Sequence, residues 1–141
     1  MEDCLFCQIV SGEIPSRTVY EDDHAFAFLD VNPLAPGHTL VIPKHHHETL
    51  GELPTEESAA LAAAVHEVAP AVEAGMDADA TTVACNNGEA AGQEVPHVHY
   101  HVVPRYEGDG YGPIHALFDG PTDVSDDELD DIADAIGTAL D

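Results

Sequence analysis

The stretch of sequence that decides the fold is residues 97–105, which read HVHYHVVPR. Histidine alternates with apolar residues over its first half, and successive side chains of a β-strand point to opposite faces of the sheet. As a strand, it predicts that His97, His99 and His101 share one face, while the residues between them face a core. Packing alone does not explain three histidines on one face, so the stretch also indicates a functional site.

The chain is strongly acidic. Its 141 residues include 28 Asp and Glu but only three Lys and Arg, which gives a formal net charge of -25. Such a surface repels nucleic acid, so we expect no nucleic-acid partner. With 44% hydrophobic residues the chain can still bury a core, unlike a disordered acidic tail. We expect a halophilic source, because at 1 M ionic strength the Debye length of about 3 Å screens the self-repulsion.

The sequence predicts a cytoplasmic protein with no membrane partner. It shows no signal-peptide pattern and no apolar run of about 20 residues, the length that spans a bilayer. Cysteines stay reduced in the cytoplasm. Two of the three, Cys4 and Cys7, form a Cys-x-x-Cys pair, which indicates either a metal half-site or a redox couple.

Hydrophobic periodicity predicts an α+β arrangement. A change to helical spacing at Thr55 predicts a helix that ends near Gly75. Ser125 begins a capping-box pattern before an acidic amphipathic helix that reaches Leu140. We expect a short helical turn over residues 4–12, strands over 18–21, 25–29, 38–43, 81–86 and 97–105, and irregular connections over 30–37, 86–96 and 106–123.

The histidines favour chemistry at phosphorus. A neutral imidazole is a nucleophile near pH 7, and a second imidazole can donate a proton or a hydrogen bond to a phosphate oxygen. Because cationic side chains are so few, phosphate oxygens would be held by histidines, backbone N–H groups and amides such as Asn86 and Gln93. These residue types predict phosphoryl or nucleotidyl transfer.

A catalytic zinc ion held by all three histidines is the alternative. On a strand, the first and third histidines stand about 13 Å apart, since the rise is roughly 3.3 Å per residue. At that separation three histidines on one strand rarely converge on one metal ion, although two of the three could bind it. A zinc hydrolase of this kind would lose its activity on chelation without unfolding.

Residues 97–103 match the pattern His-φ-His-φ-His-φ-φ, in which φ is apolar, and so resemble the histidine triad (HIT) family. Further segments resemble the nucleotide-binding branch of that family, so that the similarity covers roughly residues 4–106. These segments are CLFC at 4–7, FLDVNP at 28–33, PGHTLVIPK at 36–44 and AGQEVP at 91–96.

The resemblance implies a single HIT domain over residues 1–141, with its core at about 4–106 and a C-terminal tail and helix at 107–141. The implied fold is α+β, a largely antiparallel five-stranded sheet with flanking helices, in a homodimer. The implied activity is that of a hydrolase or nucleotidyltransferase, which cleaves nucleoside monophosphates from phosphoramidate, polyphosphate or related conjugates through a nucleotidyl-histidine. A purine nucleotide-binding or sensing module with little turnover is the alternative.

The resemblance also implies roles for individual residues. His99 is the expected nucleophile, and His101 is expected to bond a phosphate oxygen and to help protonate the leaving group. Glu94 departs from the pattern, because a hydroxyl residue often stands there, near the leaving group. The expected nucleotide contacts are Leu5, Phe6, Ile9 and Phe28 around the base, Asp30 and Asn32 at the ribose, and Asn86, Gln93 and Val95 at phosphate or ribose.

Members of this family that carry the N-terminal Cys-x-x-Cys pair bind zinc. The ligands that the resemblance implies for a structural, tetrahedral Zn²⁺ are Cys4, Cys7, His46 and His97, with His47 as the alternative to His46. Such a site would tie the N-terminus to the histidine stretch and leave His99 free of metal.

Overall fold

The computed structural model describes residues 3–140, which form two compact units. The first unit extends to Asp109 and the second begins at Gly110. The interpretation of residues 1–141 as one domain stays a prediction. Within residues 3–140, no helix combines the length and the apolar character that crossing a bilayer requires.

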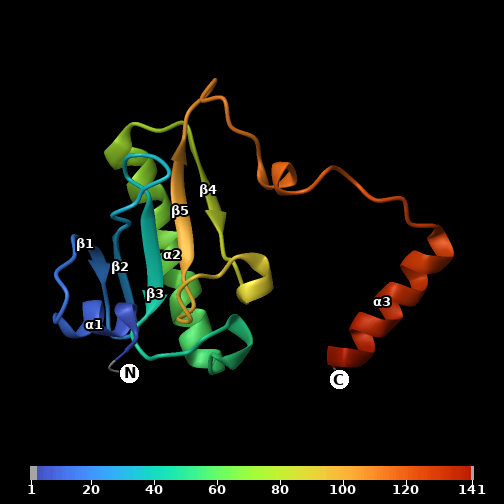
Figure 1. Cartoon of the computed structure of the whole chain (residues 1–141), viewed down its shortest axis with the longest axis horizontal. Coiled ribbons are helices and arrows are strands. Elements are labelled where there is room, and N and C mark those ends of the chain that lie inside the picture. Colours follow the sequence, from blue (N-terminus) through green and yellow to red (C-terminus); the bar gives the residue numbers. More distant parts are fainter. Residues whose placement is uncertain (1–2, 141) are drawn as a thin grey trace. The chain divides into compact units, whose positions relative to one another are not determined.

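A five-stranded sheet forms the centre of the first unit, as Figure 1 shows. Its order is β1-β2-β3-β5-β4, and every neighbouring pair is antiparallel. The predicted α+β class with a five-stranded antiparallel sheet is therefore confirmed. The strands are β1 (Thr18–Glu21), β2 (Ala25–Leu29), β3 (Thr39–Pro43), β4 (Ala80–Ala84) and β5 (Tyr100–Arg105).

The long helix α2 (Thr55–Met76) covers one face of the sheet and runs behind β3 and β5 in Figure 1. Its apolar residues recur at the helical spacing seen in the sequence, so one stripe of the helix meets the strands. The core between them joins Leu61, Ala64, Val68 and Val72 of α2 to Ala25, Ala27, Val41, Val98 and Val102.

The short helix α1 (Leu5–Ser11) packs on the opposite face. Cys4 caps its N-terminus by accepting the N–H of Cys7 on Sγ, and Gly12 ends it at a φ of 87°, a left-handed conformation that suits glycine. Strand β2 is thus buried on both sides, with alanines toward α2 and phenylalanines toward α1. The second core contains Phe6 and Ile9 of α1 with Phe26, Phe28, Leu40 and Ile42.

Strand β5 begins at Tyr100, three residues later than predicted. The backbone before it bonds elsewhere, since His97 N–H donates to Val95 O and Val98 N–H donates to His47 O, both at 2.8 Å. The ladder with β3 accordingly starts at the pair Val41 and Tyr100. The alternation of faces nonetheless continues through the irregular residues, because Val98 joins the core under α2 while His97 contacts Phe6 of α1.

Irregular segments contain short 3₁₀ helices that periodicity alone does not predict. They lie at Leu50–Glu52 and Glu89–Ala91 in the first unit and at Ile114–Leu117 in the second. The second unit also contains the predicted acidic helix, α3 (Asp126–Leu140). Its capping box is present, because Glu128 N–H donates to Ser125 Oγ and Ser125 N–H donates to Glu128 Oε1, both at 3.2 Å.

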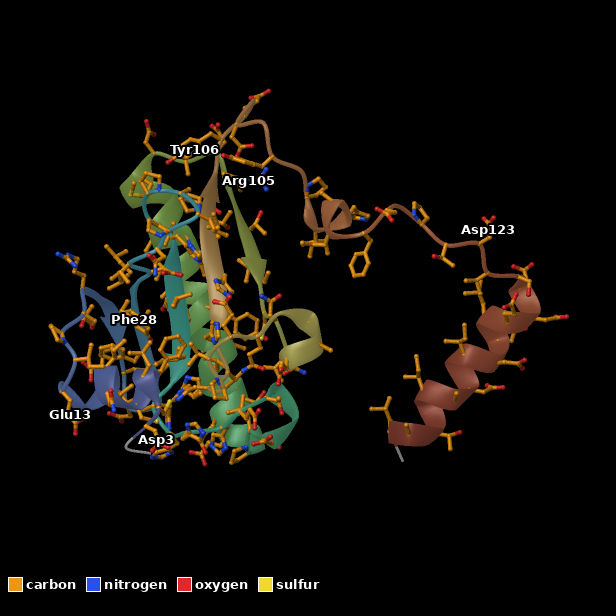
Figure 2. The ribbon with its side chains drawn as sticks, in the orientation of Figure 1. Asp3, Glu13, Phe28, Arg105, Tyr106 and Asp123 are labelled. Atoms are coloured by element: carbon orange, nitrogen blue, oxygen red, sulfur yellow. The ribbon has the colours of Figure 1, made fainter. Side chains whose placement is uncertain are left out.

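Ion pairing neutralises little of the acidic surface. Lys44 Nζ lies 2.8 Å from Glu21 Oε2, and Arg105 bonds Asp109 through Nε at 2.8 Å. Figure 2 shows Arg105 and Tyr106 where β5 ends. Three basic residues stand against 28 acidic ones, so lysine and arginine can pair with only a few of the carboxylates.

We therefore expect the melting temperature to rise steeply between 0.1 and 2 M KCl, because salt shortens the Debye length and screens carboxylate repulsion. Differential scanning calorimetry at several KCl concentrations measures the effect. Sucrose at matched water activity is the control, since it does not screen charge. A melting temperature that is flat or falling with KCl contradicts this expectation.

Candidate functional site

A pocket of about 480 Å³ opens between α1, the β2–β3 connection and the segment that leads into β5. Its lining joins apolar side chains to a group of histidines and two carboxylates. Figure 2 places one of these side chains, Phe28 of β2, beside α1. Of the residues expected from the sequence, the lining includes Leu5, Phe6, Ile9, Phe28, Asp30, Asn32, Val95, His99 and His101, together with His38 and Glu94.

His99 is held in one tautomer. Its Nδ1 lies 2.8 Å from the carbonyl oxygen of His97, and a carbonyl can only accept, so Nδ1 carries the proton. The lone pair of the neutral ring is then on Nε2. The side chain is buried, and the ring of Phe6 packs edge-on against it at 5.1 Å and 90°. A buried imidazole with a free Nε2 lone pair is suited to act as a nucleophile.

His38 and His101 form a second oriented pair. Leu34 N–H donates to His38 Nδ1 at 3.1 Å, so His38 carries its proton on Nε2. That Nε2–H donates to His101 Nδ1 at 2.9 Å, which places the His101 proton on Nε2. His101 can therefore donate a hydrogen bond from Nε2, and its ring centroid lies 5.0 Å from that of His99.

Both rings of this pair are neutral at pH 7. Burial, then the neighbouring His99 and His38, lower the pKa of His101 to about 4. Burial also lowers the pKa of His38, although Asp30, whose Oδ2 lies 3.8 Å from His38 Nδ1, opposes that shift. A neutral pair keeps the directional hydrogen bond between the rings.

We expect acid to destabilise the fold through this pair. The folded pKa of each ring lies below the unfolded value of about 6.5, so the unfolded state binds more protons as the pH falls below 6.5, and for His101 this difference extends down to about pH 4. Stability is full above pH 6.5 and falls with pH, by at most about 1.4 kcal/mol per pH unit for each histidine. Urea unfolding at 2 M KCl measures this loss of stability. The high salt screens the repulsion between carboxylates, which acid would otherwise relieve with the opposite effect on stability.

The control compares His101→Asn with His66→Asn, because His66 is exposed on α2. His101→Asn is expected to reduce the fall of the free energy of unfolding below pH 6.5, whereas His66→Asn leaves that fall unchanged. An equal fall in all three proteins contradicts the expectation.

No sequence pattern assigns a role to His38. It sits directly after a Pro-Gly pair, where the sequence is read as the first residue of a strand. In the structure it precedes β3, its N–H donates to Ala35 O at 3.0 Å, and it is 2% exposed. The sequence signal that could identify His38 is a histidine at a strand boundary. It matters in a chain where another histidine, on the histidine-rich strand, requires a buried hydrogen-bond partner.

The connection between β2 and β3 positions Asp30. Its Oδ1 accepts the N–H of Asn32 at 2.8 Å, which fixes the carboxylate at the rim of the pocket beside His38. Asn32 is exposed and also lines the pocket. A carboxylate in this place can accept hydrogen bonds from paired hydroxyl groups.

Gln93 lies outside the pocket lining, as does Asn86. The amide of Gln93 is used within the protein: Oε1 accepts Gly88 N–H at 2.8 Å, and Nε2 donates to Glu48 O at 2.7 Å and Val95 O at 3.0 Å. Its side chain therefore braces the connection between β4 and β5. The phosphate or ribose contacts expected of these two residues stay predictions.

Cys4, Cys7, His46 and His97 form a cluster at the N-terminus of α1, with one ligand atom of each within 4.8 Å of the others. His97 Nε2–H donates to Pro43 O at 2.8 Å, so its Nδ1 lone pair faces the sulfurs, at 3.3 Å from Cys4 and 3.6 Å from Cys7. His46 Nδ1 lies 3.5 Å from Cys7 Sγ. By contrast, His47 Nε2 lies 3.3 Å from Glu57 Oε1.

These distances fit a tetrahedral metal ion. Zinc bonds of about 2.3 Å to sulfur and 2.0 Å to nitrogen place the two ligand atoms about 3.6 Å apart. The three sulfur–nitrogen distances in the cluster match this value within a few tenths of an ångström. Burial and the neighbouring Cys4 raise the pKa of Cys7, a shift that a bound cation would reverse.

Phe6 connects the cluster to the pocket. Its ring packs edge-on against His97 at 5.8 Å, His99 at 5.1 Å and Phe28 at 5.5 Å. One side chain of α1 therefore touches a possible metal ligand, the candidate nucleophile and the apolar wall.

Comparisons with known proteins agree with this architecture. The HIT domain family matches residues 11–108. Adenylylsulfatase HINT3 of Arabidopsis thaliana is 44% identical over 107 residues, which cover 76% of this chain and 54% of that protein.

Two solved structures show similarity at the level of the fold. A Zn-bound histidine triad family protein from Mycobacterium smegmatis superimposes with a TM-score of 0.75 at 42% identity, covering 86% of this chain and 85% of its own. A histidine triad nucleotide-binding protein from Candida albicans gives a TM-score of 0.82 at 31% identity, covering 98% and 97%.

Proposed function

Because the chain belongs to the HIT domain family, we propose that it is a nucleotide hydrolase or nucleotidyltransferase that works through a nucleotidyl adduct on His99. The observation that carries this proposal is the tautomer of His99, whose Nδ1–H donates to His97 O and leaves the Nε2 lone pair available in the pocket. The names of the Arabidopsis and Candida relatives, an adenylylsulfatase and a nucleotide-binding protein, support a nucleotide as the ligand.

The nucleotide is seated by three kinds of contact. Its base lies against the apolar wall made by α1 and Phe28, and the ribose hydroxyls donate to Asp30 beside Asn32. The α-phosphate then reaches His99 and His101. No lysine or arginine occurs among the described residues that line the pocket, so His101 Nε2–H and backbone N–H groups would hold the phosphate oxygens.

The first half-reaction forms the adduct. The Nε2 lone pair of His99 attacks the α-phosphorus, the bond from phosphorus to the leaving atom breaks, and its electron pair goes to the leaving atom. That atom takes up a proton delivered from solvent by way of His101 Nε2, whose orientation His38 fixes. His97 O stabilises the positive charge on the substituted ring through the Nδ1–H bond.

The second half-reaction releases the nucleotide. Water attacks the same phosphorus, the bond to Nε2 breaks and returns its electron pair to His99, and one proton of the water passes to solvent. The products are a nucleoside monophosphate and the protonated leaving group. If another acceptor replaces water, the same adduct supports nucleotidyl transfer.

We propose that Cys4, Cys7, His46 and His97 hold a structural Zn²⁺, supported by their distances and by the Zn-bound relative from M. smegmatis. Four protein ligands complete a tetrahedral shell, so the ion would contribute folding free energy and no open coordination position. His97 would be held from both ring nitrogens, by Pro43 O and by the metal.

The assembly is proposed as a homodimer. Strand β4 is an edge of the sheet, paired only with β5 among the described residues, and Val83 on it is 40% exposed. Such an edge is a surface that a second copy can cover. Sedimentation velocity at 2 M KCl tests this, with a monomer as the contradicting result. The cytoplasmic location and the halophilic source stay predictions.

Adduct trapping is the experiment that tests the function. The protein is mixed with excess adenosine phosphoramidate in 2 M KCl, quenched within seconds and analysed by intact mass spectrometry, while AMP is followed by chromatography. Turnover through His99 predicts AMP together with a transient adenylyl adduct. A nucleotide-binding or sensing module would bind AMP in calorimetry and give neither product, and that result would overturn the proposal.

A further inference from the structure

The described lining of the pocket carries carboxylates and no lysine or arginine. Among the described residues of that lining, the only carboxylates are Asp30 and Glu94. Asp30 is engaged with Asn32 N–H and lies beside His38. The net charge of -25 adds a field of the same sign over the whole chain.

Glu94 stands on a well-held backbone. The amide of Gln93, the residue before it, makes three hydrogen bonds to the main chain. Val95, the residue after it, packs against the apolar cluster that contains Phe6 and Phe28. The side chain of Glu94 lines the pocket and is nevertheless exposed, so its carboxylate lies at the pocket mouth.

The leaving group of a substrate also belongs at the mouth. The apolar wall takes the base and Asp30 takes the ribose, so these parts of the nucleotide occupy the body of the pocket. In-line attack by His99 requires the leaving atom to lie opposite Nε2, on the far side of the phosphorus. The leaving group is therefore the part of the substrate that extends toward solvent and meets Glu94.

Charge at Glu94 then discriminates between leaving groups. A pyrophosphate or sulfate leaving group brings further negative charge to a carboxylate with no cation among the lining residues, which is repulsive. An amine that carries an ammonium on its chain brings a positive charge to the same place, which is attractive. A neutral amine gains from neither effect.

We propose that Glu94 is a specificity-determining residue that selects phosphoramidates whose amine leaving group bears a second, cationic amine, and that disfavours anionic leaving groups. This inference rests on the proposed function, because it concerns the same reaction. The phosphorus–nitrogen bond breaks on attack by His99, the amine leaves with the electron pair and takes up a proton from solvent, and water releases AMP from the adduct. Glu94 takes no part in the bond changes and acts only by its charge.

A matched pair of substrates tests this selection. The aminopropyl and butyl amidates of AMP have leaving groups of equal length that differ only in a terminal ammonium or methyl group. We expect kcat/KM for the aminopropyl amidate to exceed that for the butyl amidate by about tenfold at 0.2 M KCl, equivalent to about 1.4 kcal/mol. The ratio should shrink toward one at 2 M KCl, because salt screens an exposed charge.

Three variants separate the outcomes. Glu94→Gln is expected to bring the ratio near one, and Glu94→Lys to reverse it. Glu67→Gln removes an equal charge from the exposed side of α2, on the opposite face of the sheet, and should keep the wild-type ratio. A ratio that Glu94→Gln leaves unchanged, with both amidates turned over, overturns the proposal for Glu94 alone. If the wild-type protein turns over neither amidate and forms no adduct, the proposed function itself fails.

Discussion

Replacing His99 with asparagine is expected to lower kcat for AMP release by at least about a thousandfold, the scale seen when a covalent nucleophile is lost. Asparagine removes the Nε2 lone pair, so the adduct cannot form. Its amide N–H can still donate to His97 O, which preserves the hydrogen bond that orients this segment. Steady-state release of AMP from adenosine phosphoramidate and intact mass spectrometry measure the two effects.

Folding must be checked, since His99 is buried and packs against Phe6. The melting temperature of His99→Asn should stay within a few degrees of the wild-type value, and calorimetry should still detect AMP binding. His66→Asn is the matched control on the exposed side of α2 and should keep full activity. A folded His99→Asn protein that retains wild-type turnover would place the nucleophile elsewhere.

Replacing Cys4 with serine is expected to release the metal and to lower the free energy of unfolding by about 4 kcal/mol when free zinc exceeds its dissociation constant a thousandfold. Cys4 supplies one ligand, and its sulfur also caps α1 by accepting Cys7 N–H. Serine keeps an oxygen acceptor for the cap, so most of the loss reports on the metal. Atomic absorption gives the zinc content, and chemical unfolding gives the stability.

The control is Cys85→Ser, which changes the third cysteine outside the cluster and should keep the zinc content of the wild-type protein. Chelation of the wild-type protein should lower its melting temperature toward that of Cys4→Ser and should not lower it further in that variant. Purified protein with less than one zinc per five chains, and a melting temperature that chelation does not move, would refute a structural metal. Activity lost on chelation without any change in melting temperature would point instead to metal at the triad.

The sequence predicts the fold well where burial follows a simple period. The stripe on α2 follows from side-chain spacing, and the capping box at Ser125 follows from local hydrogen bonding. Where β5 begins does not follow, because the bonds of His97 and Val98 go to segments distant in the chain or to irregular turns. Alternation of side chains survives there without the ladder that normally accompanies it.

The candidate site is likewise predicted only in part by the sequence. Motif spacing singles out His99 and His101, but the proton positions on their rings depend on the carbonyl of His97 and on the partner His38. Likewise, the sequence leaves His46 and His47 open, while in the structure His46 lies beside Cys7 and His47 beside Glu57. These distinctions arise from tertiary contacts, which a pattern along the chain does not encode. Gln93 is a different case. The sequence predicts that its amide contacts the ligand, and in the structure the amide makes hydrogen bonds to the backbone.

The seven residues of α1 have a consequence for how this chain can diverge. The helix and its cap provide two thiols on one side and three residues of the apolar pocket wall on the other, with Phe6 between them. An insertion or deletion of one residue within the helix turns everything beyond it by about 100°, so it would disturb the pair of thiols and the pocket wall at the same time. We therefore expect descendants of this chain to change their base preference through single substitutions in α1. The length of the helix and the two cysteines Cys4 and Cys7 are expected to be kept together.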